Sequence, residues 1–200
     1  MRKLGGSWPN QDETTNAQTN HCVNATVAME RYIGIDPDGH GGFAVLDVWS
    51  GGTQAAQCFS VSNNDAFKMD EMLQRFLPDA NVVWIERPFH PRGKGMAAVA
   101  LQERGIGLWN GLIFKNKKRG DVCVEEVPPV TWRKYFNFHS SGSASPNTKV
   151  ASVRKVQELF PGLVSCKVTH GSCEALLIAV AAKECTAGRS VPKGAKPPKL

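Results

Sequence analysis

Three acidic residues and one histidine stand where their side chains could act together. Asp36 and Glu86 each close a short apolar segment, and His170 and Glu174 lie four residues apart at the start of a third. Grouped carboxylates repel one another, and Mg²⁺ or Mn²⁺ neutralises them through oxygen ligands, while imidazole is compatible with Mn²⁺. Two such ions about 4 Å apart can clamp the attacking and leaving oxygens of a phosphodiester. If the four groups meet, they indicate metal-assisted phosphodiester hydrolysis.

Each of these residues also has a structural interpretation. Asp36 opens Asp-Pro-Asp-Gly, which is good turn chemistry, and Glu174 could be an acid that favours a helix N-terminus. The structural interpretation is weaker for Glu86, because an acid after Val-Val-Trp-Ile is costly at the end of a buried strand. A competing zinc site would use four ligands whose spacing matches no usual Cys/His pattern: Cys166, His170, Cys173 and Cys185.

The elements that must position these residues follow from apolar periodicity and turn residues. Strands are predicted at 32–36, 42–48, 53–61, 82–86 and 122–127. Helices are predicted at 64–76, 96–114, 149–160 and 172–183, with a helical turn opened by Pro128 and Pro129 and running through Trp132. The order favours an α/β sheet with an antiparallel meander on one side and parallel strands on the other. If the first and fourth strands are parallel neighbours, Asp36 and Glu86 emerge at the carboxyl edge, where such sheets bind ligands.

The 200 residues suit one domain, predicted at 31–186, with a polar N-terminal extension predicted to be disordered at 1–30 and a flexible basic tail at 187–200. The apolar segments are too short for a membrane span, and the chain shows no secretory signal. The six cysteines include no CxxC pair, so reduced, buried thiols are expected. There is no phosphate-binding GxxxxGK[ST] loop and no support for a Ser/His/Asp triad.

The net charge of +6 permits a nucleic-acid partner. The tail carries four of these charges, on Arg189, Lys193, Lys196 and Lys199. We therefore expect the affinity for DNA to fall steeply as the salt concentration rises. Three sets of basic residues are candidate DNA contacts: Arg87, Arg92 and Lys94; Lys115, Lys117, Lys118 and Arg119; and Lys149 with Arg154 and Lys155 on the helix that it starts. For the second set, the pattern favours a solvated turn over DNA contact. A lysine beside the metals could stabilise the phosphate in the transition state.

An ordered set of motifs over residues 31–184 resembles the RuvC-like Holliday junction resolvases, most closely their plastid branch, the monokaryotic chloroplast resolvases. The matching stretches are Ile33-Gly34-Ile35-Asp36-Pro37-Asp38, Trp84-Ile85-Glu86, Gly105-Ile106-Gly107-Leu108-Trp109-Asn110-Gly111-Leu112, Val127-Pro128-Pro129-Val130-Thr131-Trp132, Thr148-Lys149, Leu159-Phe160-Pro161, His170-Gly171 and Glu174-Ala175-Leu176-Leu177-Ile178-Ala179. The last two site residues lie four apart, as in the plastid branch, whereas bacterial members usually have three. Asp38, where bacterial members commonly have Gly, is given no catalytic role.

The resemblance implies an RNase H-like fold, with a mixed five-stranded sheet flanked by helices, and a homodimer. It implies that Asp36, Glu86, His170 and Glu174 hold Mg²⁺ or Mn²⁺ in a two-metal site, with Lys149 as the active-site lysine. The implied activity is paired, symmetric nicking of four-way (Holliday) junction DNA, in chloroplast DNA recombination and nucleoid segregation. We further expect the 96–114 helix to carry much of the dimer interface and Phe89 to act as a wedge at the junction centre.

Two alternatives stay open at this stage. The chain could be another RNase H-like nuclease, acting on RNA–DNA hybrids or flaps. It could also be a nucleic-acid-binding module with a degenerate site, although the presence of Asp36, Glu86 and Glu174 argues against decay.

Overall fold

The computed structural model describes residues 28–87, 95–117, 122–138, 146–165 and 168–187. A five-stranded sheet has the order β3-β2-β1-β4-β5. β1 pairs antiparallel with β2, and β2 with β3, whereas β1–β4 and β4–β5 are parallel. The predicted meander and parallel half are therefore both confirmed. In chain order, the elements are β1 (Met29–Asp36), β2 (Gly42–Trp49), β3 (Gln54–Ser60), α1 (Ala66–Phe76), η1 (Leu77–Asp79), β4 (Val82–Glu86), α2 (Met96–Asn116), β5 (Cys123–Val127), α3 (Pro129–Tyr135), α4 (Pro146–Leu159), η2 (Pro161–Ser165) and α5 (His170–Thr186).

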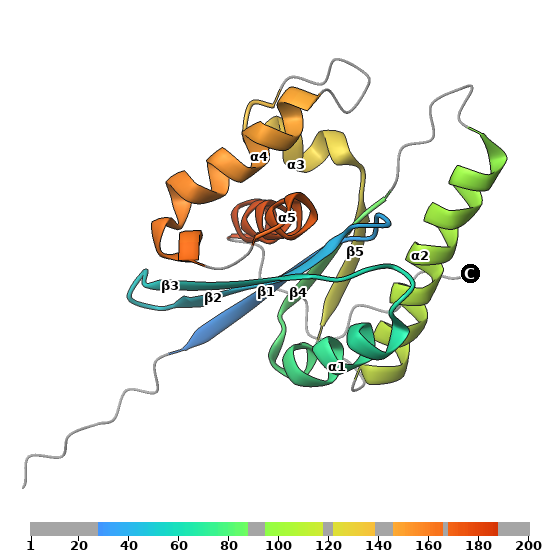
Figure 1. Cartoon of the computed structure of the whole chain (residues 1–200). Coiled ribbons are helices and arrows are strands. Elements are labelled where there is room, and N and C mark those ends of the chain that lie inside the picture. The colour runs from blue at the N-terminus through green and yellow to red at the C-terminus, as the bar shows by residue number, and fades with distance from the viewer. Residues whose placement is uncertain (1–27, 88–94, 118–121, 139–145, 166–167, 188–200) are drawn as a thin grey trace, which may run out of the picture.

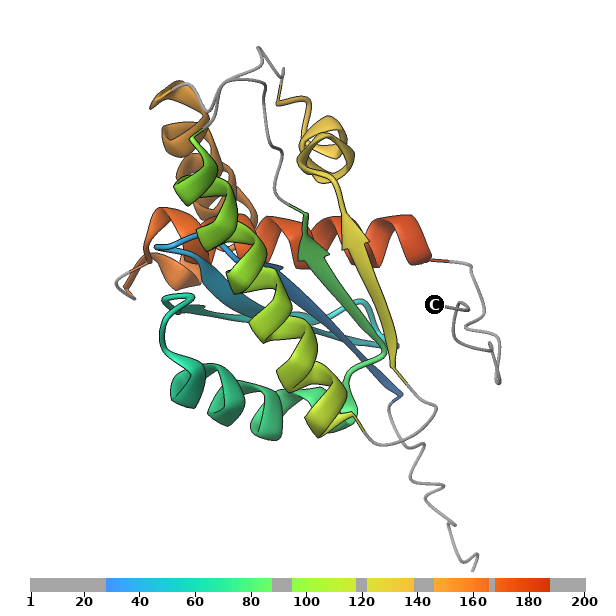
Figure 2. The ribbon, with the colours of Figure 1, turned by 90° about the vertical axis from the view of Figure 1, so that its right-hand side faces the viewer.

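The helices form two layers, one on each face of the sheet (Figure 1). Alternate residues of a strand point to opposite faces, so β1 sends Tyr32 into one core and Ile33 into the other. The first core lies under α3, α4 and α5, and the second lies under α1 and α2. Figure 2 shows α5 running across one face of the strands and α2 lying on the other.

Helix α5 packs closely on β1 because Gly34 has no side chain. A Cβ added at Gly34 would lie 2.0 Å from the carbonyl oxygen of Ala175, which is far too close for any real contact. Helix α5 is also buried all round from Gly171 to Ala182, so it is a core element rather than a surface one. The glycine thus brings the first turns of α5 next to the strand that carries Asp36.

Several boundaries differ from the sequence-based prediction. Helix α5 begins at His170 rather than 172, because Thr169 and Ser172 form a capping box that starts the helix. Strand β1 begins at Met29, two residues before the predicted domain boundary, because Met29 and Glu30 pair with Trp49 and Val48 of β2. The other helices and strands lie within three residues of their predicted ranges, and the predicted turn at Trp132 continues to Tyr135 as α3.

No helix in the described segments is both long and apolar enough to cross a membrane.

Candidate active site

Asp36 and Glu86 lie at the carboxyl ends of two adjacent parallel strands. Ile35 of β1 is paired with Ile85 of β4, so the next residue of each strand is a carboxylate at the same edge. Both are buried, with 3% of Asp36 and 7% of Glu86 exposed. The backbone N–H of Asp38 donates to Oδ1 of Asp36 at 3.1 Å and orients that carboxylate. The predicted meeting of the two acids at one edge is confirmed.

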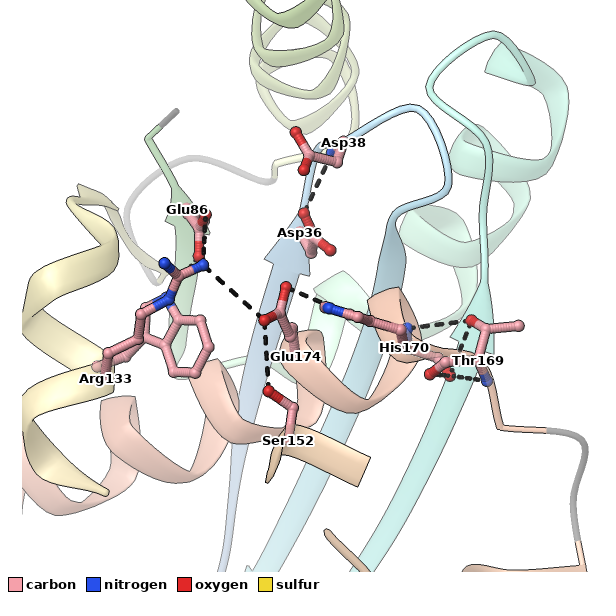
Figure 3. Close-up of polar contacts among 10 residues, drawn as sticks. Asp36, Asp38, Glu86, Arg133, Ser152, Thr169, His170 and Glu174 are labelled. Carbon is pink, nitrogen blue, oxygen red and sulfur yellow. Dashed lines mark hydrogen bonds and ion pairs between the residues drawn. The ribbon is translucent and has the colours of Figure 1, made fainter. Parts of the chain in front are cut away.

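Glu174 and His170 reach this edge from the first turns of α5 (Figure 3). Glu174 is 5% exposed, and its Oε1 accepts a 3.3 Å hydrogen bond from the hydroxyl of Ser152 on α4. Its Oε2 lies 3.4 Å from Nδ1 of His170, one turn earlier on the same helix face. The four residues predicted from strand ends and helix spacing therefore come from three separate elements to one site.

Two residues of α3 complete the site, and sequence reasoning assigned neither of them a role. The guanidinium of Arg133 lies between two carboxylates, with Nη2 4.0 Å from Oε1 of Glu86 and 3.8 Å from Oε1 of Glu174 (Figure 3). Trp132 is fully buried, and its indole N–H donates to Oε2 of Glu86 at 2.5 Å. The only local signal was the Pro-Pro helix start after β5, which puts the next turn beside the carboxyl edge.

Burial raises the pKa of each of the three carboxylates. The pKa of Asp36 lies well above its ordinary value because of burial, and secondarily because Glu86, Asp38 and Glu174 are close. Burial raises the pKa of Glu86 to about 8 and that of Glu174 to about 7, although the positive charge of Arg133 opposes both shifts. Burial therefore disfavours the ionised form of these carboxylates, and a further cation at the site would stabilise that form.

The histidine titrates in the opposite sense. Burial lowers the pKa of His170, and the nearby charges of Lys149 and Arg133 lower it further. A neutral imidazole is the form that can bind a metal ion.

A cavity of about 650 Å³ opens over the site. The edge of the sheet and the neighbouring helices both contribute to its lining, which includes Asp36, Asp38, Gln102, Arg133, Lys149, His170 and Glu174. Gln102 of α2 donates to Oδ1 of Asp38 at 2.8 Å and so ties the start of α2 to the rim of the cavity. The cavity reaches Asp36 and Glu174, whereas Glu86 lies beside it at the same edge of the sheet.

The predicted basic residues divide between those near the cavity and those far from it. Lys149 lines the cavity, and a neighbouring hollow of about 500 Å³ is lined by Lys149, His170 and Arg154, whose side chain is 81% exposed. Arg87 follows Glu86 directly and is exposed. These three basic residues therefore lie at or next to the candidate site.

Lys115 and Lys117 lie at the other end of α2. Lys115 is 13 residues beyond Gln102, which corresponds to roughly 20 Å along a helix, and its ammonium pairs with Asp70 at 2.8 Å. The structure does not bring these two lysines to the candidate site. The remaining predicted DNA contacts, Phe89, Arg92, Lys94, Lys118 and Arg119, lie outside the described residues.

The donor types suit a hard divalent cation, because Asp36, Glu174 and His170 line one cavity and Glu86 ends the strand next to that of Asp36. In the arrangement seen here, however, no group of three Asp, Glu, His or Cys side chains among the described residues is set to hold a metal ion. The guanidinium of Arg133 lies between Glu86 and Glu174, where a cation would be needed. The residues fit Mg²⁺ or Mn²⁺ by chemistry, provided that Arg133 withdraws.

The alternative zinc site is not formed. Cys173 is fully buried in the core under α5, Cys185 is exposed three turns further along that helix, and Cys166 lies outside the described residues. Among the described residues Cys58, Cys123, Cys173 and Cys185 form no disulfide, but only Cys173 is buried, whereas Cys58 and Cys123 are half-buried and Cys185 is exposed.

Comparison with known proteins places the fold but not the activity. No protein-family model and no curated protein matches the sequence. Among solved structures, RuvC of Thermus thermophilus aligns with a TM-score of 0.53 at 21% identity, covering 79% of this chain and 96% of that one. T. thermophilus RuvC in complex with a Holliday junction substrate aligns with a TM-score of 0.54 at 16% identity, covering 82% and 98%. The predicted RNase H-like fold, a mixed five-stranded sheet flanked by helices, is therefore confirmed.

Proposed function

We propose that this chain is a structure-specific DNA endonuclease that resolves four-way (Holliday) junctions by paired, symmetric nicks with Mg²⁺ or Mn²⁺. One observation carries the proposal: Asp36, Glu86 and Glu174 are buried together at the carboxyl edge of an RNase H-like sheet shared with RuvC. Burial raises the pKa values of all three carboxylates, so keeping them ionised at this edge costs stability. Such a cost is typical of a functional site rather than of a purely structural one.

In this proposal Asp36, Glu86, Glu174 and His170 hold the metal ions. When bound, two such ions supply an activated water and stabilise the leaving oxygen of the phosphodiester. The chain's own residues do the rest. Trp132 and Ser152 hold the carboxylates of Glu86 and Glu174 in place, and Asp38 orients Asp36 through its backbone N–H. Lys149, on the wall of the cavity, is placed to contact the scissile phosphate and stabilise its developing charge.

The DNA strand would lie along the two hollows that share Lys149 and His170. The second hollow follows one face of α4, where Lys149 and Arg154 supply positive charge and Val150 and Val153 supply apolar contact area. Arg87 extends the positive charge at the end of β4. Phosphates bound along this path would run past the carboxylates, which is the geometry that strand cleavage requires.

The proposal includes a homodimer through α2. A junction needs two opposed cuts, and a two-fold dimer supplies two equivalent sites at a fixed separation. Helix α2 leaves Met96, Leu101 and Phe114 exposed, at 88%, 54% and 86%. A Cβ added at Gly107 or Gly111 on the same helix would meet nothing within 4 Å, so a second helix could approach closely there.

We also propose a role in chloroplast DNA recombination and nucleoid segregation. This part of the proposal rests on the likeness of the motifs to the plastid branch, above all the four-residue spacing of His170 and Glu174. It is tested by locating the tagged protein in plant cells.

The activity is tested with purified full-length protein and four labelled substrates: a four-way junction, a linear duplex, an RNA–DNA hybrid and a flap. Each is incubated with Mg²⁺, Mn²⁺ or EDTA. We expect two symmetric nicks in the junction, with either metal and not with EDTA. Preferential cleavage of the hybrid or the flap would assign the chain to another class of RNase H-like nuclease. Junction binding without any cleavage would identify a degenerate binding module.

A further inference from the structure

Arg133 makes unusual contacts for a residue beside an anionic metal site. Its Nη2 faces Glu86 and Glu174 at 4.0 and 3.8 Å, distances that indicate ion pairing without close hydrogen bonding. Its Nε is buried and has no hydrogen-bond partner. Its guanidinium carbon lies 5.1 Å from the ring centroid of Trp132, whose indole N–H donates to Glu86. The guanidinium is thus held by charge and by an aromatic face rather than by a closed set of hydrogen bonds.

We propose that Arg133 is an internal counter-ion for Glu86 and Glu174 which competes with divalent cations for these two carboxylates. The inference rests on the proposed metal site. In the metal-free protein the guanidinium neutralises the pair, and it must withdraw for the pair to bind a metal ion. Arg133 is therefore a positioning residue that sets how tightly the site binds metal.

The competition follows from charge and space. A guanidinium about 4 Å from two carboxylate oxygens and a metal ion bound to the same oxygens repel each other strongly, because the protein interior has a low effective dielectric constant. The contacts of Arg133 are loose, and its unpartnered Nε loses no hydrogen bond when the side chain moves. The side chain lines the 650 Å³ cavity and is 21% exposed, so a withdrawn guanidinium has room beside the carboxylates.

The test is Mn²⁺ binding by calorimetry to full-length protein without DNA. Arg133→Met removes the charge at similar length, Arg133→Lys keeps it, and Lys134→Met removes the neighbouring exposed charge as a matched control. We expect Arg133→Met to bind Mn²⁺ about tenfold tighter or more than wild type, and the two other variants to stay within about threefold. Asp36→Asn identifies the binding heat that belongs to this site. Unchanged or weaker Mn²⁺ binding by Arg133→Met overturns the proposal.

Thermal unfolding separates competition from a merely structural role. In EDTA we expect Arg133→Met to unfold at a lower temperature than wild type, because the buried carboxylates lose their counter-ion, and we expect saturating Mn²⁺ to close the gap. A gap of equal size with and without Mn²⁺ overturns the proposal.

The wild-type protein provides a measurement that does not depend on a variant of Arg133 folding. If Mg²⁺ displaces the guanidinium from Trp132, it changes tryptophan emission in wild type, and Trp132→Phe removes that change. Absence of a Mg²⁺-dependent difference between the two, at a Mg²⁺ concentration where binding is saturated, counts against displacement. None of these measurements uses DNA, so they can support the inference even if junction cleavage fails, and the reverse also holds.

Discussion

Trp132 donates its indole N–H to Oε2 of Glu86 at 2.5 Å, across 46 residues of sequence, inside the protein. Substituting Trp132 by Phe keeps most of the apolar ring and removes the donor, which leaves a buried carboxylate oxygen without its partner. We expect a loss of about 1–3 kcal/mol in the free energy of unfolding. Urea unfolding measures it, with Trp49→Phe on the half-buried end of β2 as the control. A loss no larger than that of the control would show that the hydrogen bond contributes little.

Gly34 should tolerate no side chain. In Gly34→Ala the new Cβ would lie 2.0 Å from the carbonyl oxygen of Ala175, and backbone on both sides must move. We expect destabilisation by about 2 kcal/mol or more, as for other overpacked core sites, together with weaker Mn²⁺ binding because α5 carries Glu174 and His170. Gly51→Ala, where an added Cβ meets nothing within 4 Å, is the matched control. Equal stability of the two variants would contradict the close packing of α5 on β1.

Asp36→Asn should abolish cleavage while leaving junction binding intact. The amide keeps the size of the side chain but removes the charge that a metal ion requires, and we expect the rate to fall by about a thousandfold. Single-turnover cleavage and gel-shift measurements on the same four-way junction separate the two effects. Cleavage at the wild-type rate would refute the proposed metal site.

Metal-free protein should lose stability as the pH rises through neutrality. Glu86 and Glu174 have pKa values of about 8 and 7 in the folded protein, against an ordinary value of 4.5. Between these values the folded state binds more protons than the unfolded state, so the free energy of unfolding falls with pH, from about pH 4.5 to about pH 8.

Divalent metal should reverse this trend, since it binds the ionised carboxylates and takes the place of the protons. Thermal unfolding from pH 5 to pH 8, in EDTA and in Mn²⁺, checks both expectations. The Mn²⁺-induced rise in melting temperature is expected to grow with pH. A rise that is independent of pH would show that these carboxylates do not bind the metal.

Arg154 should contribute to junction affinity through phosphate contact. Its exposed side chain is on the α4 hollow beside Lys149. Arg154→Met should weaken junction binding by a few fold at physiological salt and reduce the salt dependence by about one phosphate contact. Lys115→Met is the comparison, and because Lys115 is already paired with Asp70 we expect a smaller effect. A larger effect at Lys115 would instead place the DNA along the far end of α2.

The helices, the strands and the acids that end two of the strands could be predicted from local patterns in the sequence. Apolar segments closed by Asp36 and Glu86, and the four-residue spacing of His170 and Glu174, are local patterns, and the sheet topology made them converge as predicted. Such features depend on strand and helix periodicity, which is readable from neighbouring residues.

The residues that contact these acids, in contrast, could be identified only from the packing of elements that are distant in sequence. Arg133 and Trp132 stand more than 40 residues from both Glu86 and Glu174 in sequence, and no local pattern marks either as a partner. Their contacts depend on the packing of α3 against the carboxyl edge of the sheet and on α5 settling over Gly34. Likewise, the sequence makes Lys115 and Arg154 equivalent candidates for DNA contact. The direction of α2 places Lys115 far from the carboxylates, whereas Arg154 lies on the hollow next to them. Charge balance at a buried site is a property of three-dimensional distance, which spacing along the chain does not encode.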